Sequence, residues 1–199
     1  MASAVDSSRS GGFPLDRYWI VPAVRAFLAI AVGCTVALTK DLHTPFFGLV
    51  AFGIFATLDG LFTAVLTVMF APRGVTRTQF VIQGLVGLTA GILALVLSGN
   101  GLGMFLYLVT VWALLTGALE LYSAIRERNT RNVARDWMFT GGLSVLLAIV
   151  LVLIPDDALL AIGLFGAWAV VVGVFQAIGA ASLHFVSRTE GQQPEGREQ

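Results

Sequence analysis

Residues 112–124, which read WALLTGALELYSA, contain a spacing of side chains that the chain uses three times. An aromatic residue, Trp112, is followed on the same stretch by Gly117, Glu120 and Ala124. The same spacing recurs about 57 residues away in each direction, at Phe55, Gly60, Thr63 and Thr67 and at Trp168, Gly173, Gln176 and Ala180. A second, looser series of equivalent positions comprises Gly33, Gly91 and Ala148. The chain is therefore predicted to contain three copies of one structural unit.

The composition is that of a membrane protein. Hydrophobic residues make up 57% of the 199 residues and charged residues only 12%, with a mean hydropathy of +0.85. Soluble domains have about twice that share of charged residues. The formal net charge is zero, which gives no basis for binding nucleic acid. The single cysteine, Cys34, excludes an intramolecular disulfide and a cysteine metal cluster.

We predict an all-α membrane protein with six transmembrane helices arranged as three tandem helical hairpins. A helix that crosses the bilayer needs about 20 mostly apolar residues. Six segments meet this requirement, at residues 18–39, 45–70, 79–98, 102–125, 137–154 and 158–186. A soluble helical bundle is the alternative, and it requires a polar face on each helix. Several of these segments lack such a face, so we favour the membrane protein.

The repeat divides this transmembrane domain, residues 18–186, into units at about 18–77, 78–135 and 136–186. Residues 1–17 and 187–199 are polar and are predicted to be disordered tails. Each unit has an even number of spans, so all three units insert in the same orientation. Such parallel repeats are compatible with a pseudo-threefold axis along the membrane normal.

Arginine residues fall on one predicted side of the membrane. That side holds Arg9, Arg17, Arg25, Arg73, Arg77, Arg126, Arg128, Arg131, Arg135, Arg188 and Arg197, whereas the other side holds only Lys40. By the positive-inside rule, both termini are predicted to be cytoplasmic, and the protein to be a multi-pass protein of the plasma membrane.

Three polar residues inside the predicted spans are candidates for a site. Asp59 is predicted to lie near the middle of the bilayer, where an acid must be paired, protonated or turned towards the interior. Glu120 is close enough to the cytoplasmic boundary to reach it or to pair with a basic residue such as Arg25. Gln176 is the repeat equivalent of Glu120. If the repeats surround an axis, Asp59, Glu120 and Gln176 converge on a central polar site.

Two interpretations of Asp59 remain open at this point. It is either a structural acid that is neutral or hydrogen-bonded, for example to Thr57 or Thr63, or a site that responds to protons or cations.

The glycines have two interpretations as well. Glycines on a helix allow a second helix to approach closely. The close contacts are expected either within the bundle or between copies of the chain. The glycines concerned are Gly60, Gly117 and Gly173, together with the GxxxG pair Gly87 and Gly91.

No sequence motif for catalysis, for a cofactor or for a metal ion is found. The chain lacks HExxH, P-loop, GxSxG and paired-cysteine motifs. His43 and His184 are predicted to lie on opposite sides of the membrane and cannot form a metal pair. We therefore expect a protein that is not an enzyme.

The chain resembles the HdeD acid-resistance membrane-protein family, whose members consist of short two-helix repeats of unknown function. The matching features over residues 17–186 are Trp19 and Arg25 at the entry, Gly33 and Gly91, a turn with Pro155, and the pairs Trp112/Gly117 and Trp168/Gly173. The first repeat departs from this pattern, with Phe55 in place of tryptophan and Asp59 beside Gly60.

The resemblance implies a bacterial inner-membrane protein linked to acid or envelope stress tolerance, with no catalytic residues to carry over. Its expected partners are the lipid bilayer and a second copy or another membrane protein. The alternative is a small transporter or channel that uses Asp59 and carries protons or a small solute.

Overall fold

A computed structural model describes residues 19–70, 75–126 and 131–190, and these ranges contain helices and no strands. The helices are α2 (Ile20–Leu38), the short 3₁₀ helix η1 (Lys40–Leu42), α3 (Pro45–Phe70), α4 (Val75–Val96), α5 (Gly101–Arg126), α6 (Arg131–Leu153) and α7 (Ala158–Glu190). Helix α7 continues to Glu190, so residues 187–190 of the predicted C-terminal tail are helical. Residues 1–18 and 191–199, including the predicted N-terminal tail, lie outside the described ranges.

Six of these helices are long and apolar enough to cross a membrane, which confirms the predicted fold class. Their outer surfaces carry large apolar side chains, such as Phe27, Met69 and Ile178, that are 70%, 66% and 62% exposed. Side chains of this kind are stable at such exposure when lipid is the surrounding solvent. The chain is a multi-pass membrane protein.

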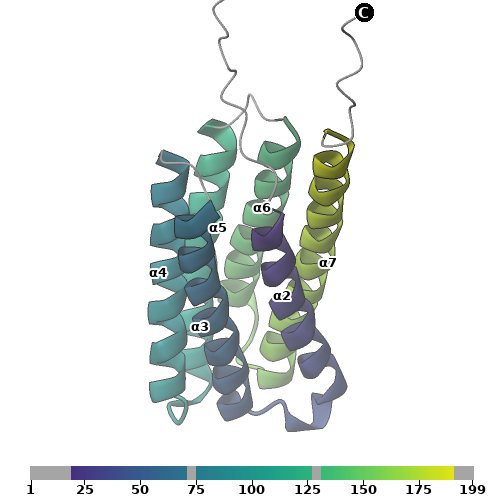
Figure 1. The fold of residues 1–199 in the computed structure, drawn as a ribbon. Coiled ribbons are helices and arrows are strands. Elements are labelled where there is room, and N and C mark those ends of the chain that lie inside the picture. Colours follow the sequence, from purple (N-terminus) through teal and green to yellow (C-terminus); the bar gives the residue numbers. More distant parts are fainter. Residues whose placement is uncertain (1–18, 71–74, 127–130, 191–199) are drawn as a thin grey trace, which may run out of the picture.

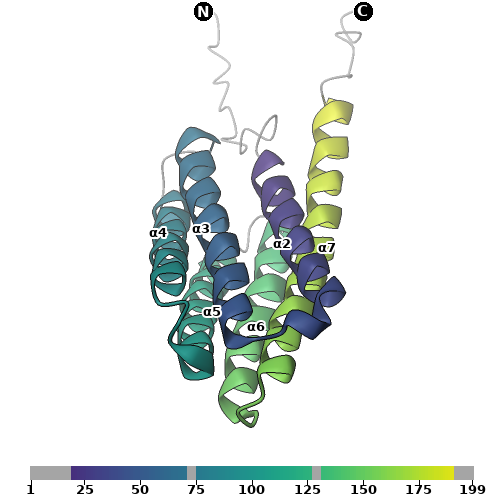
Figure 2. The same cartoon turned by 90° about the horizontal axis from the view of Figure 1, so that it is seen from below.

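The closest helix pairs lie between the predicted hairpins and not within them. The most extensive contacts are those of α3 with α4, α5 with α6, and α2 with α7 (Figures 1 and 2). The two helices of each predicted hairpin, such as α2 and α3, share fewer contacts. The helices at the two ends of the chain are thus neighbours, and the bundle closes into a ring.

One glycine contact repeats around this ring. A Cβ atom added to Gly60 would lie 2.5 Å from the carbonyl oxygen of Gly84, and one added to Gly117 would lie 2.8 Å from that of Gly141. A Cβ atom on Gly173 would lie 3.1 Å from the carbonyl oxygen of Ala26. Only glycine permits backbones to approach so closely. Since these positions are equivalent in the repeat, the three interfaces follow a pseudo-threefold arrangement.

The GxxxG pair on α4 also faces the inside of the bundle. A Cβ atom on Gly87 would lie 3.1 Å from the Cα of Gly60, and one on Gly91 would lie 2.8 Å from the carbonyl oxygen of Gly53. Both glycines therefore serve the contact of α4 with α3.

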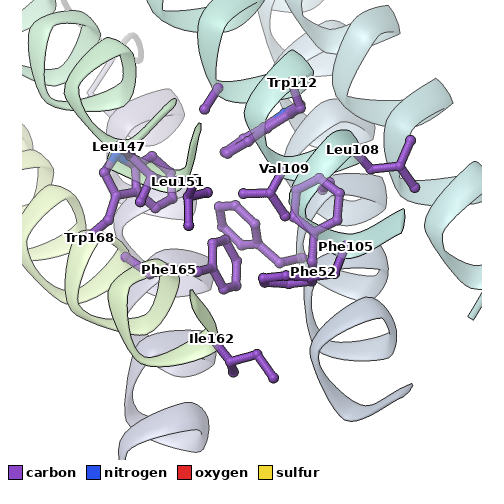
Figure 3. Close-up of a cluster of buried hydrophobic side chains, with 14 of the residues drawn as sticks. Phe52, Phe105, Leu108, Val109, Trp112, Leu147, Leu151, Ile162, Phe165 and Trp168 are labelled. Carbon is purple, nitrogen blue, oxygen red and sulfur yellow. The ribbon is translucent and has the colours of Figure 1, made fainter. Parts of the chain in front are cut away.

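Aromatic rings fill the centre of the bundle (Figure 3). The repeat-equivalent residues Phe55, Trp112 and Trp168 form a triangle, with centroid separations of 5.9 Å for Phe55–Trp112, 6.1 Å for Phe55–Trp168 and 5.3 Å for Trp112–Trp168. All three pairs meet edge to face, which is the favourable arrangement for aromatic rings. Phe52 and Phe165 are fully buried beside them, 5.7 Å apart.

Candidate functional site

A buried ion-pair cluster lies between these aromatic rings and the end of the bundle at which α2 begins and α7 ends, called the termini end below. Its centre is Arg25 on α2. Nε of Arg25 donates to Oδ1 of Asp59 on α3 at 3.1 Å, and Nη1 donates to Oε1 of Glu120 on α5 at 3.1 Å. The side chains of Arg25, Asp59 and Glu120 are 15%, 9% and 3% exposed. One guanidinium thus joins two acids that the sequence places in different repeats.

Glu120 accepts more hydrogen bonds than any other side chain of the cluster. Besides Arg25, it accepts a hydrogen bond from Nε2 of Gln83 on α4 at 2.8 Å and from Oγ1 of Thr140 on α6 at 2.7 Å. Arg25, Gln83 and Thr140 occupy equivalent positions in the repeat, in the same register as Gly33, Gly91 and Ala148. The first helix of each hairpin therefore provides one donor to the same carboxylate.

A second pair extends the polar cluster towards the termini end. The hydroxyl of Ser123 on α5 donates to Oε1 of Gln79 on α4 at 2.7 Å, and both side chains are buried. Gln79 lies one helical turn from Gln83, and Ser123 lies one turn from Glu120. This contact fixes α4 against α5, the two helices that also meet through Gln83 and Glu120.

Gln176 lies at the edge of the cluster. It lines a small pocket of about 50 Å³ together with Arg25, Thr140 and Asp136, and the pocket is closed on other sides by Phe80, Trp137 and Phe175. Oε1 of Gln176 is buried and has no hydrogen-bond partner in the described part of the chain. The pocket adjoins Arg25 and includes a third acid, Asp136.

The structure brings Asp59 and Glu120 to one guanidinium and places Gln176 in the adjoining pocket. The partner of Asp59 is Arg25 and not Thr57 or Thr63, whose buried hydroxyls have no hydrogen-bond partner among the described residues. The pairing of Glu120 with Arg25 is the one that the sequence suggested. Within the described ranges, no group of three or more His, Cys, Asp or Glu residues could hold a metal ion.

Several residues of the cluster were not among the candidates from the sequence: Gln79, Gln83, Ser123 and Thr140. The signal that could have found two of them was present, because the repeat register aligns Gln83 and Thr140 with Arg25. Uncharged polar residues on apolar helices are common, however, and their convergence became evident only in the folded ring.

Part of this cluster lies in a segment that resembles a known repeat. Residues 82–153 match the family model described as a short repeat of unknown function, DUF308. The matched region includes Gln83, Glu120 and Thr140, whereas Arg25 and Asp59 lie outside it. It supports a relationship to a family of membrane proteins that contain this repeat. No curated protein and no solved structure shows significant similarity to the chain.

Proposed function

We propose that the protein is a non-enzymatic protein of the bacterial inner membrane that supports tolerance of acid or envelope stress, with both termini in the cytoplasm. The resemblance to HdeD-like proteins and the DUF308 match support the family context. The concentration of arginines on one side of the spans supports the orientation. The geometry supports a rigid bundle whose termini end is held by the Arg25 cluster.

The observation that carries this proposal is the convergence of all three repeats on Glu120. Arg25, Gln83 and Thr140 each donate to it, so α2, α4 and α6 are fixed around α5 at one depth. A buried polar network with satisfied hydrogen bonds rigidifies a fold and specifies one packing arrangement. Beyond the cluster, the rings of Phe52, Trp112, Phe165 and Trp168 occupy the axis. Such a bundle is suited to keeping its packing intact under stress.

The test is survival at low pH in the source bacterium or in a bacterial host that lacks related proteins. Deleting the gene, or omitting it from the host, should lower survival, and wild-type protein should restore it. Arg25→Gln should lower both the abundance of the protein in the membrane and survival. The control is Arg126→Gln, since Arg126 is exposed and donates only to Tyr122 in the described structure. Wild-type survival without the gene would overturn the proposed function.

A second candidate function is proton-linked transport, and the pocket beside Arg25 favours it. The pocket contains Asp136 and the unpartnered oxygen of Gln176, so polar groups continue from the cluster towards the termini end. Transport would require the aromatic rings at the axis to move apart. Proton flux into proteoliposomes, measured with an enclosed pH-sensitive dye, tests this directly. Flux no greater than in protein-free liposomes would reject transport.

A further inference from the structure

The buried cluster around Arg25 contains more acids than cations. Asp59 and Glu120 both bind the guanidinium of Arg25, and the other members that bind Glu120, Gln83 and Thr140, are uncharged. If both acids were ionised, one negative charge would remain uncompensated inside a bundle that spans the membrane. An uncompensated buried charge is costly, and such groups are usually paired or neutralised.

Neighbouring charged side chains do not supply the missing positive charge. Asp136 on α6 lines the adjoining pocket and adds a further acid. Arg77 on α4 donates to the carbonyl oxygen of Val68, and Arg126 on α5 donates to the hydroxyl of Tyr122. On α7, the polar side chain that lines the pocket beside Arg25 is Gln176, which is neutral. Among the residues whose side chains the structure describes, Arg25 is the one cation that binds Asp59 or Glu120.

The hydrogen bonds distinguish the two acids. Glu120 receives two N–H donors on Oε1 and the hydroxyl of Thr140 on Oε2, and several donors favour the ionised form of a carboxyl group. Asp59 has a single hydrogen-bond partner in the described structure, Nε of Arg25. The guanidinium and Glu120 therefore form the charged pair. Asp59 has fewer hydrogen-bond donors to stabilise its ionised form.

We propose that the cluster binds one proton, which is carried by the carboxyl group of Asp59. The guanidinium of Arg25 lies between the two acids, since it donates to both of them. This assignment depends only on the cluster, and it stands whether or not the protein acts in stress tolerance.

Infrared spectroscopy of the purified protein in detergent at pH 7 tests the proposal. The wild-type protein should show the C=O stretching band of a protonated carboxylic acid, which lies above the amide I band. Biosynthetic incorporation of aspartate with ¹³C in the side-chain carboxyl should shift this band to lower wavenumber, and ¹³C-labelled glutamate should leave it in place. The absence of the band, or its shift with labelled glutamate, would overturn the proposal.

Two variants identify the aspartate. Asp59→Asn should abolish the band and keep a Tm close to that of the wild type, because asparagine resembles a protonated aspartic acid in size and charge. Asp136→Asn should retain the band, since Asp136 lies in the pocket and binds neither Arg25 nor Glu120 directly. A band that persists in Asp59→Asn, or disappears in Asp136→Asn, contradicts the assignment to Asp59. Because the labelling uses the wild-type protein, the proposal stays testable if a variant fails to fold.

Discussion

Nη1 of Arg25 donates to Oε1 of Glu120 at 3.1 Å, although the two residues lie 95 positions apart in the chain. Arg25 begins the first repeat and Glu120 ends the second, so this contact crosses the centre of the ring. Gln83 and Thr140 reach the same carboxylate from the equivalent positions of the other repeats. A pseudo-threefold scaffold therefore surrounds a group, Glu120, that occurs in only one of its copies.

Removing the guanidinium should destabilise the bundle strongly. Arg25→Gln leaves Asp59 and Glu120 without their shared cation, and breaking a buried ion pair from one side costs about 3–5 kcal/mol. The free energy of unfolding in detergent should fall by this amount. Arg126→Gln serves as the control and should change it by less than about 0.5 kcal/mol, as for most exposed positions. Equal losses in both variants would show that the cluster has no special structural role.

The donors from α4 and α6 should each contribute less than Arg25. Thr140→Val keeps the shape of the side chain but deprives Oε2 of Glu120 of its hydrogen bond, which costs about 1–3 kcal/mol. Thr89→Val is the matched control, because the hydroxyl of Thr89 is exposed and bonds only to the carbonyl of Leu85 on its own helix. Chemical denaturation of both variants measures the difference. If Thr140→Val is as stable as Thr89→Val, Glu120 does not depend on Thr140.

Much of the architecture could be predicted from the sequence. Long apolar segments have one stable form in lipid, so the six helices follow from hydropathy alone. The repeat also identified Gly60, Gly117 and Gly173 as equivalent positions, and the structure places all three at equivalent contacts. Hydropathy could not show which helices pack most closely. The two helices of each predicted hairpin are neighbours in the ring, but their contacts are not the most extensive ones.

The site was only partly predictable, for a related reason. An acid within a span must find a partner, and this rule singled out Asp59 and Glu120. Sequence reasoning favours Asp59 as the buried acid, because Glu120 is close enough to the cytoplasmic boundary to reach it. In the structure Glu120 is the more deeply buried of the two, with a side chain 3% exposed against 9% for Asp59, and it has more partners. Distance along a helix measures depth in the membrane but does not measure distance from the axis of the bundle.

The glycine contacts should be sensitive to a single methyl group. Gly117→Ala would place its Cβ 2.8 Å from the carbonyl oxygen of Gly141, so α5 and α6 must move apart, at a cost of about 1–3 kcal/mol. Gly142→Ala is the control, since a Cβ there meets no atom within 4 Å. That variant should gain about 0.5–1 kcal/mol from its higher helix propensity. Thermal unfolding of both in detergent should give Tm shifts of opposite sign, and shifts of the same sign would contradict the close contact.

Closure of the ring between the first and last helices should be detectable by cross-linking. A Cβ on Gly166 of α7 would lie 2.9 Å from the Cβ of Val36 on α2, and the atoms nearest to it are side-chain atoms of Val36, so cysteines at these two positions are close enough for a disulfide after a small shift. Gly166→Cys with Val36→Cys, in a Cys34→Ala background, should lose both thiols to mild oxidation, as measured by maleimide labelling after denaturation. Each single cysteine should remain labelled. Full labelling of the oxidised double variant in a folded protein would show that α2 and α7 are apart and that the pseudo-threefold ring is open.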